Sequence, residues 1–187
     1  MKKVFESLPV VQTERLILRP VEEGDYTAIF EYARDPDVAK YTTWEAHKNI
    51  EDSKAHVRFI LKRYKENKPS NWVVILKDGN RLIGTCGFVS EFRSNNRAEV
   101  GFAISKDCWN MGYVTEALKK ALEFGFKTIG YNRIEAICDV ENTASAKVME
   151  KCGMKFEGVL RQYIVKHGQF RDVKSYAVLR EEFRARD

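Results

Sequence analysis

Alternating polar and apolar residues near the start of the chain predict a first strand over residues 13–20, which ends at Pro20. Apolar residues then recur at helical spacing, first from about Glu22 to Arg34 and again between residues 49 and 68. Pro36 is expected to end the first of these helices, because proline lacks a backbone N–H and clashes with the preceding turn. The pattern therefore predicts one strand followed by two amphipathic helices.

The middle of the chain predicts a hairpin and a further strand. Apolar segments at residues 72–76 and 82–89 flank Asp78-Gly79, a pair that tolerates the positive φ of a tight turn between antiparallel strands. A polar stretch around residues 94–96 then leads into a fourth strand at residues 98–104.

The last third of the chain alternates helices with strands. A nearly continuous apolar stripe predicts a helix from about Gly112 to Ile129, and Gly153 is a natural stop for a short helix over residues 143–152. Further strands are expected at residues 133–138, 156–165 and 170–179, with the last two joined around His167-Gly168-Gln169.

The predicted order of elements is β-α-α-β-β-β-α-β-α-β-β. This order is typical of an α/β (α+β) layer fold with a mixed, mostly antiparallel seven-stranded sheet, helices on both faces, and one crossover from the fourth strand to the fifth. Hydrophobic residues make up 44% of the 187 positions, which is enough for one continuous core. We expect a single domain over residues 1–187, with an ordered core of about 10–183.

Charge and cysteine content argue against several classes of protein. The 32 Lys and Arg against 27 Asp and Glu leave a formal charge of +5, which favours a phosphorylated ligand but lacks the clustered basic stripe of a nucleic-acid reader. Four cysteines, Cys86, Cys108, Cys138 and Cys152, form neither the CxxC pairs of a zinc site nor a disulfide framework. No apolar run suits a signal peptide or a membrane span. We therefore expect a cytoplasmic protein without a metal site, membrane contact or direct nucleic-acid contact.

The segment richest in candidate chemistry, residues 100–117, joins a strand to a helix start through Gly112. A helix start presents unpaired N–H groups and the positive end of the helix dipole, so a loop there can hold a pyrophosphate. A glycine at this point is equally explained by a tight strand-to-helix turn. The local pattern leaves both interpretations open.

Residues 109–117, with the sequence W-N-M-G-Y-V-T-E-A, resemble the acetyl-coenzyme A loop of GCN5-related N-acetyltransferases (GNAT). The form W-x-x-G-Y-x-T-E-A is typical of the branch that contains the Rim-type ribosomal-protein N-acetyltransferases. The similarity begins with T-E-R-L-x-L-R at residues 13–19 and continues through Ile83-Gly84 and residues 98–101, 142–145 and 150–158. The resemblance implies the GNAT fold, with the fourth and fifth strands splayed apart, and transfer of an acetyl group from acetyl-CoA to a primary amine.

The resemblance also implies a position for each part of acetyl-CoA. The pyrophosphate is expected in the loop begun by Trp109 and Asn110, held by backbone N–H groups of Met111, Gly112, Tyr113, Val114 and Thr115 and by the Thr115 hydroxyl. The wider superfamily often has Gly or Ala where Val114 stands. The backbone of Phe102, Ala103 and Ile104 is expected to pair with the pantetheine arm as an added strand. Asn142 is expected to bond that arm from the far side, a role compatible with capping a helix at Thr143.

Acetyl transfer to an amine needs a neutral nucleophile, a stabilised oxyanion and a proton for the departing thiolate. The resemblance makes Glu99 the expected base, acting directly or through water, and a backbone N–H of Phe102 or Ala103 the expected oxyanion donor. Many relatives protonate the thiolate with a tyrosine, but Met149 stands at that position here, so Ser145 is the expected replacement. The alternatives are a solvated strand glutamate and a serine that packs a helix.

The acceptor amine is expected to enter over the first two helices and the closing hairpin, past Trp44, His47, Arg161 and Tyr163. The branch favours a protein N-terminal α-amine. A small-molecule acetyltransferase acting on a polyamine, amino acid or antibiotic is one alternative. A non-catalytic acetyl-CoA sensor, suggested by Met149, is another. The branch often forms dimers, so it also implies a homodimer as one assembly.

Overall fold

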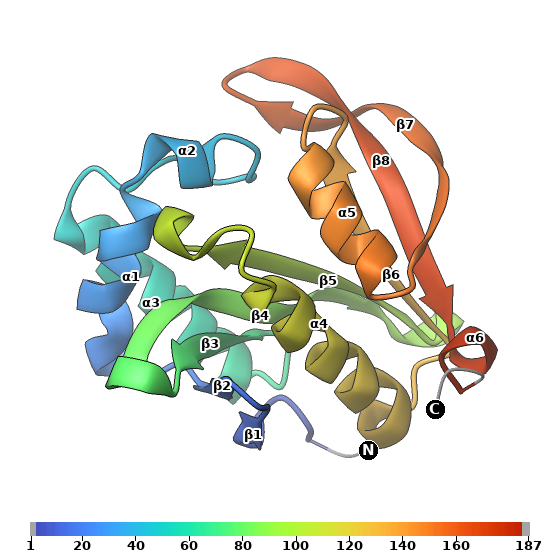
Figure 1. Ribbon diagram of the computed structural model, residues 1–187, viewed down its shortest axis with the longest axis horizontal. Helices are drawn as coiled ribbons and strands as arrows, with labels where there is room; N and C mark the ends of the chain where they lie inside the picture. The colour runs from blue at the N-terminus through green and yellow to red at the C-terminus, as the bar shows by residue number, and fades with distance from the viewer. Residues whose placement is uncertain (1–2, 185–187) are drawn as a thin grey trace.

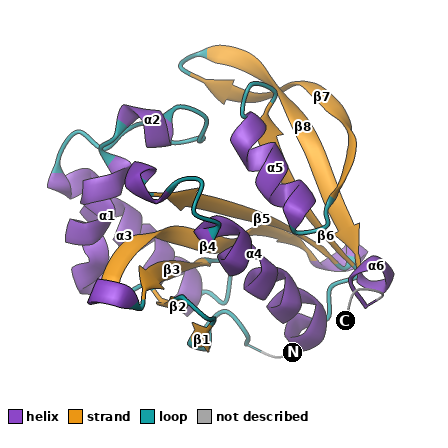
Figure 2. Ribbon diagram, in the orientation of Figure 1, coloured by secondary structure: helices purple, strands orange, loops and turns teal. Residues whose placement is uncertain are grey.

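The computed structural model describes residues 3–184 and contains one mixed sheet of eight strands (Figure 1, Figure 2). The strand order is β1-β2-β3-β4-β5-β6-β8-β7, and every neighbouring pair is antiparallel except β5 and β6. The bounds are β1 Val11–Gln12, β2 Leu16–Pro20, β3 Asn71–Leu76, β4 Arg81–Phe92, β5 Arg97–Ile104, β6 Arg133–Asp139, β7 Lys155–Lys166 and β8 Gln169–Leu179.

Helices cover both faces of this sheet (Figure 1). Their bounds are α1 Tyr26–Ala33, α2 Pro36–Ala39, α3 Ile50–Lys65, α4 Tyr113–Glu123, α5 Thr143–Lys151 and α6 Arg180–Arg184, and a π-helical segment, Phe124–Ile129, extends α4. The helices α1 and α3 pack together on one face, and α4 and α5 lie together on the other. Within residues 3–184, no helix is both long and apolar enough to cross a bilayer.

The predicted fold class is confirmed, and some details differ from the prediction. The sheet has eight strands instead of seven, because the two-residue β1 adds to the edge of β2. Pro36 begins α2 at its first position, where its missing N–H costs nothing, and Asp35 caps this helix by accepting a hydrogen bond from the Asp37 N–H. The core also starts before residue 10, since Phe5 and Leu8 are buried in it. Residues 1, 2 and 185–187 of the expected domain lie outside the described part.

The apolar stripe of α4 packs against the sheet as its spacing predicts. Ala117, Leu118, Ala121 and Leu122 are fully buried. A Cβ at Gly125 would lie 2.6 Å from Ile134 Cδ1 and 3.0 Å from the Phe88 ring, so only glycine allows the helix to approach the sheet this closely. The helix position, and therefore the position of its N-terminus, is set by this packing.

The sheet divides in the middle, between β5 and β6. These strands pair only through three positions, from Arg97 with Arg133 to Glu99 with Glu135. Beyond Glu99, β5 stays paired with β4 as far as Ile104, while β6 stays paired with β8. The two halves therefore diverge from Glu99 onward (Figure 1), which confirms the expected splay.

Candidate active site

The diverging part of β5, Val100–Ile104, has one edge without a strand partner among the described residues. Along an extended strand, successive backbone groups point to alternate edges, so some N–H and C=O groups of this segment face the split. Phe102 and Ala103 are half-buried here. The carbonyl of Ile104 already accepts a 3.0 Å hydrogen bond from the Trp109 indole. The expected pairing of Ile104 with the pantetheine is therefore limited to its N–H and the second lone pair of its carbonyl.

The loop after β5 turns sharply into α4. Asn110 and Gly112 have positive φ values of 61° and 80°, and Gly112 is the N-cap residue of the helix. The first helical hydrogen bond runs from the Glu116 N–H to the Gly112 carbonyl at 3.0 Å. The N–H groups from Gly112 to Thr115 therefore lack intrahelical partners, as the geometry of a helix start requires. Met111, beside them, is exposed.

The starts of α3 and α5, like that of α2, are closed by side chains, in contrast to α4. Asn49 caps α3 in a reciprocal arrangement with Asp52, and Asn142 caps α5 by accepting a 3.0 Å hydrogen bond from the Ser145 N–H. Gly112 has no side chain with which to cap α4. The amide of Asn142 uses its oxygen as the cap, and no described residue accepts from its nitrogen, so the two roles expected of Asn142 are geometrically compatible.

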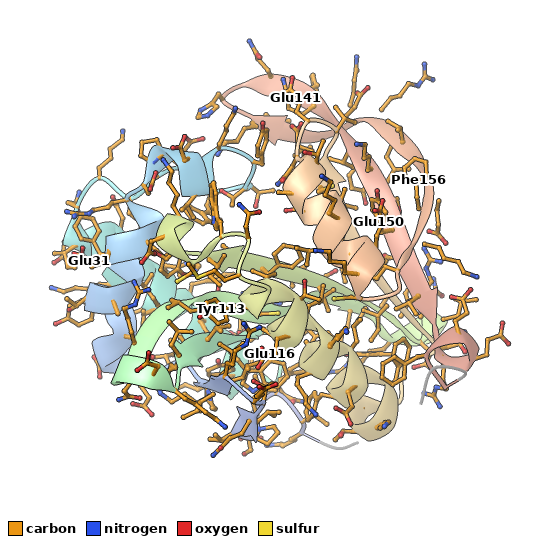
Figure 3. All side chains as sticks on the ribbon, viewed as in Figure 1. Glu31, Tyr113, Glu116, Glu141, Glu150 and Phe156 are labelled. Atoms are coloured by element: carbon orange, nitrogen blue, oxygen red, sulfur yellow. The ribbon has the colours of Figure 1, made fainter. Side chains whose placement is uncertain are left out.

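Arg15 and Glu116 form a contact that the sequence reasoning missed. Arg15, next to β2, pairs with Glu116 in the first turn of α4 and donates a 2.9 Å hydrogen bond to the carbonyl of Met111. Figure 3 shows Glu116 beside Tyr113 at this helix start. Both residues lie in motifs that carry the family resemblance, Arg15 in T-E-R and Glu116 in T-E-A. Their spacing in the sequence gives no indication that they are in contact.

Glu99 lies at the last paired position before the strands diverge. Its carboxylate accepts a 3.2 Å hydrogen bond from Ser90 on β4. Burial raises the pKa of Glu99, the Ser90 hydrogen bond lowers it, repulsion from Glu135 raises it and Arg97 lowers it, with a net result above the ordinary value. A carboxyl group with this balance holds a proton more readily than a solvated glutamate does, which suits a general base.

Strand alternation places Glu99 on the face of the sheet opposite α4. Val100 is buried, and Ile104, which shares its face, lines a small apolar space with Val114 of α4. Glu99 and Gly101 therefore face the α3 side, where a Cβ on Gly101 would lie 2.9 Å from Val89.

Residues of α3 and β4 extend this surface next to Glu99. The Arg63 guanidinium donates to the Val89 carbonyl at 2.8 Å and lies 5.5 Å from the centre of the Phe59 ring. Phe59 and Val89 are 56% and 39% exposed. We call Phe59, Arg63, Val89 and Glu99 the acceptor face, as the surface proposed below to meet the acceptor.

Trp44 and His47, two of the expected acceptor contacts, lie in the loop between α2 and α3, with their ring centres 5.6 Å apart. His47 Nδ1 lies 2.7 Å from the Ser53 hydroxyl, and burial lowers the pKa of His47. The two rings therefore lie close to each other. The lowered pKa makes His47 harder to protonate than a solvated histidine.

The closing hairpin reaches the same loop through a buried lysine that sequence reasoning missed. Lys166 Nζ donates to the carbonyls of Ala39 at 3.1 Å and Trp44 at 2.7 Å. Arg161 and Tyr163 stand a few residues earlier, in an irregular part of β7 between Leu160 and Ile164, and both are exposed. The hairpin and the α2–α3 loop therefore meet across the divided sheet.

The cysteines and Met149 are buried. Met149 is fully enclosed, so it presents no group to the split. Burial raises the pKa of Cys152 to about 12 and that of Cys138 to about 11, and it raises the pKa of Cys86 further. These thiols are poor nucleophiles at neutral pH. The residues from 3 to 184 contain no cluster of side chains suited to holding a metal ion.

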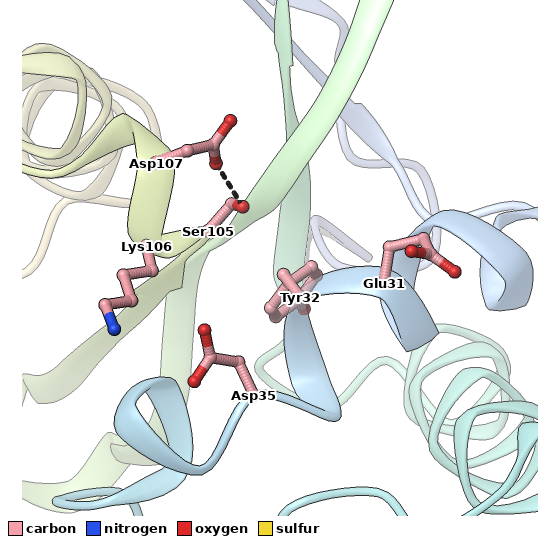
Figure 4. A pocket seen from close by; sticks show the side chains of 6 residues that line it. All are labelled: Glu31, Tyr32, Asp35, Ser105, Lys106 and Asp107. Atoms are coloured by element: carbon pink, nitrogen blue, oxygen red, sulfur yellow. Dashed lines mark hydrogen bonds between the residues drawn. The ribbon is translucent and has the colours of Figure 1, made fainter.

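A hollow lies elsewhere, between the end of α1 and the loop after β5. It has a volume of about 500 Å³ and is lined by Glu31, Tyr32, Asp35, Ser105, Lys106 and Asp107 (Figure 4). Ser105 stands six residues beyond Glu99 along β5, which corresponds to roughly 20 Å of extended strand. This hollow is therefore separate from the point where the strands divide.

Comparisons with known proteins agree with this geometry. The family model described as "Acetyltransferase (GNAT) domain" matches residues 15–155. The N-acetyltransferase p20 of Bacillus licheniformis is 32% identical over 94% of this chain and 99% of its own length. A crystal structure of a GNAT-family acetyltransferase from Bacillus anthracis has a TM-score of 0.83 and 34% identity, covering 92% of this chain and 99% of that one. The chain belongs to the GNAT family of N-acetyltransferases.

Proposed function

We propose that this enzyme transfers the acetyl group of acetyl-CoA to the α-amine of a protein N-terminus, with Glu99 as the base. The observation that carries the proposal is the position of Glu99. A half-buried carboxyl group with a raised pKa stands where β5 and β6 separate, next to the open edge of β5. A base at this point serves an amine that approaches the end of an extended donor lying along that edge.

The fit for acetyl-CoA rests on two unfilled backbone features. The uncapped start of α4, from Met111 to Thr115, suits a pyrophosphate because its N–H groups and the helix dipole both favour an anion. The open edge of β5 at Phe102 suits the pantetheine amides, with Asn142 on the other side, whereas the carbonyl of Ala103 lies against Gly84 of β4. A solved acetyltransferase of 21% identity, the microcin C7 self-immunity protein, is described in complex with acetyl-CoA and AMP.

The proposed reaction is direct attack of the amine on the thioester carbonyl. Glu99 accepts a proton from the ammonium or attacking amine, directly or through a water, so that a nitrogen lone pair is free to form the new C–N bond. The N–H of Phe102 stabilises the negative charge that develops on the carbonyl oxygen. The Ala103 N–H, the other expected donor, points toward β4, because the Ser105 N–H two residues later bonds to the Ile83 carbonyl. The C–S bond then breaks, and the hydroxyl of Ser145, half-buried at the start of α5, relays a proton from a water to the thiolate.

The charges around Glu99 favour a peptide over a polyamine. A polyamine carries further ammonium groups that need unpaired carboxylates. Here Glu135 is paired with both Arg97 and Arg133, and Glu91 is paired with Arg93. The acceptor face instead offers the exposed apolar side chains of Phe59 and Val89, which suit the side chains at the start of a peptide.

More distant relatives differ in their acceptors. The spermidine N(1)-acetyltransferase of Escherichia coli is 23% identical to this chain over 90% of it. A solved ribosomal L7/L12 α-N-protein acetyltransferase is 21% identical with a TM-score of 0.79. The preference for a protein N-terminus rests on the paired carboxylates and the apolar acceptor face, since these similarities support both classes.

The test is release of free CoA from acetyl-CoA, followed with a thiol reagent. One panel holds peptides with Ser, Ala or Met at the N-terminus, and the other holds spermidine, free amino acids and aminoglycosides. Turnover of peptides at a higher kcat/KM than of any small amine supports the proposal. Turnover of small amines alone refutes the protein acceptor, and CoA binding without turnover on either panel, unaffected by Glu99→Gln, indicates a sensor.

A further inference from the structure

Arg15 joins the start of the first long strand to the loop proposed to hold the pyrophosphate. Its backbone N–H donates to Glu116 Oε1 at 2.9 Å, and its Nε donates to Oε2 at 2.7 Å. The Thr13 hydroxyl donates to the same carboxylate. The guanidinium also lies 4.6 Å from the centre of the Tyr113 ring. One arginine thus touches three residues of the helix start, although it is about a hundred positions away in the sequence.

Glu116 creates an electrostatic conflict at this helix start. A carboxylate in the first turn of a helix is favourable for the helix alone, but it repels a pyrophosphate bound at the same end. Burial raises the pKa of Glu116, while hydrogen bonds from Thr13 and Arg15 lower it by more, so this group is ionised at neutral pH. The guanidinium of Arg15, bound to the carboxylate by two nitrogens, compensates this charge.

Arg15 also orients the peptide unit that precedes α4. Its Nη1 donates to the Met111 carbonyl at 2.9 Å, which holds that oxygen on the Arg15 side of the loop. In a planar trans peptide, the C=O and the following N–H point in opposite directions. The N–H of Gly112 is therefore directed away from Arg15. Lysine has a single charged group and lacks the planar fork, so it cannot reproduce the contacts to Glu116 and Met111 together.

We infer that Arg15 is a positioning residue for the pyrophosphate of the acetyl donor: it turns the Gly112 N–H toward the ligand and neutralises Glu116 beneath it. Arg15 acts through the loop and has no part in the acetyl-transfer step itself. The inference deepens the proposed function, since it rests on acetyl-CoA as the donor.

The experiment compares two acetyl donors that differ in the pyrophosphate. Acetyl-CoA contains it, and S-acetylpantetheine does not. For Arg15→Met, kcat/KM with acetyl-CoA should fall about tenfold or more, the loss expected when hydrogen bonds to a charged group are removed. With S-acetylpantetheine, kcat/KM should stay within about twofold of the wild type, because that donor has no pyrophosphate to contact the loop. Arg15→Lys should lie between the wild type and Arg15→Met with acetyl-CoA.

A double variant separates the two parts of the inference. Adding Glu116→Gln to Arg15→Met removes the uncompensated carboxylate and should restore part of the CoA affinity measured by calorimetry. Arg34→Met is the matched control, because Arg34 is an exposed arginine of the α1 end that pairs with Glu31 of the same helix at 3.3 Å. Thermal melts of all variants establish that the compared proteins are folded.

Equal losses with both donors would show that Arg15 only supports the fold, and unchanged kcat/KM with acetyl-CoA would overturn the inference entirely. If the double variant recovers no CoA affinity, Arg15 does not compensate the charge of Glu116. The comparison of the two donors then decides separately whether Arg15 orients the loop. Calorimetry with CoA needs no acceptor amine, so a wrong acceptor does not affect it. Absence of CoA binding by the wild type would instead refute the proposed function.

Discussion

Replacement of Glu99 by glutamine tests whether this carboxylate accepts the amine proton. The change keeps the size of the side chain and its hydrogen bond with Ser90, while it removes the basic group. General base catalysis contributes about 10²–10⁴ in rate. At about 1.4 kcal/mol per factor of ten, the loss in the variant corresponds to about 3–6 kcal/mol of transition-state stabilisation at neutral pH.

The pH dependence of kcat/KM predicts the direction in which each variant should change. Glu99 works as a base when it is deprotonated, so kcat/KM of the wild type should decline as the pH falls through its pKa. Because burial and the nearby Glu135 raise that pKa, the decline should begin at a higher pH than for a solvated glutamate. Ser90→Ala removes a hydrogen bond that lowers the pKa, so it should move the decline to still higher pH.

The assay is initial-rate CoA release on the best acceptor between pH 5 and 10, with the variants compared under identical salt. Glu99→Gln should lose the acidic limb and gain activity only as the free amine deprotonates. Glu123→Gln is the control, since Glu123 lies on α4 and pairs with Lys120 at 2.7 Å. Full activity of Glu99→Gln at neutral pH, together with an unchanged pH profile, would refute the role of Glu99 as the base.

Three further predictions test the frame of the site. Gly84→Ala should lower stability by about 1–3 kcal/mol, because the new Cβ would collide with the Ala103 carbonyl and lie 2.7 Å from the next Cα, whereas Gly24→Ala, with no neighbour within 4 Å, should not. Thermal denaturation measures both, and equal shifts would contradict the steric argument. Gly112→Ala should lose about 1–2 kcal/mol of stability, since its φ of 80° is left-handed. Gly112→Asp should in addition bind CoA roughly tenfold more weakly than Gly112→Ala in calorimetry, because like charges repel, and equal affinities would contradict the loop assignment. Lys166→Met should raise the acceptor KM and cost about 1–3 kcal/mol of stability, because two carbonyls lose their donor, and an unchanged acceptor KM would show that the hairpin contact leaves acceptor binding unaffected.

Regular elements were the most predictable part of this protein. The periodic segments at residues 49–68 and 112–129 form helices, and the alternating or apolar segments form strands, because one face of each element must be buried. The two-residue β1, the four-residue α2 and the five-residue α6 were missed. Elements this short have no period to detect, and tertiary contacts stabilise them.

The candidate site was predictable where its chemistry depends on the backbone. A glycine at the N-cap of α4 and an asparagine at the N-cap of α5 are local signals, and both residues occupy the cap positions. Their contacts with acetyl-CoA stay predictions, as do the roles of Glu99 and Ser145. The contacts of Arg15 and Lys166 could not be predicted, since each pairs with a residue more than ninety positions away.

The kinds of element, their order and the helix start that suits a phosphate follow from local sequence, because helix and strand periods, caps and turns depend on neighbours within a few residues. The place where the sheet divides, the face that Glu99 occupies and the arginine that pairs with Glu116 depend on the three-dimensional fold. These features depend on strand register and on close packing, as where Gly125 lets α4 approach Ile134 and Phe88. Register and packing join segments that are far apart in the chain, and no local pattern records which segments will meet.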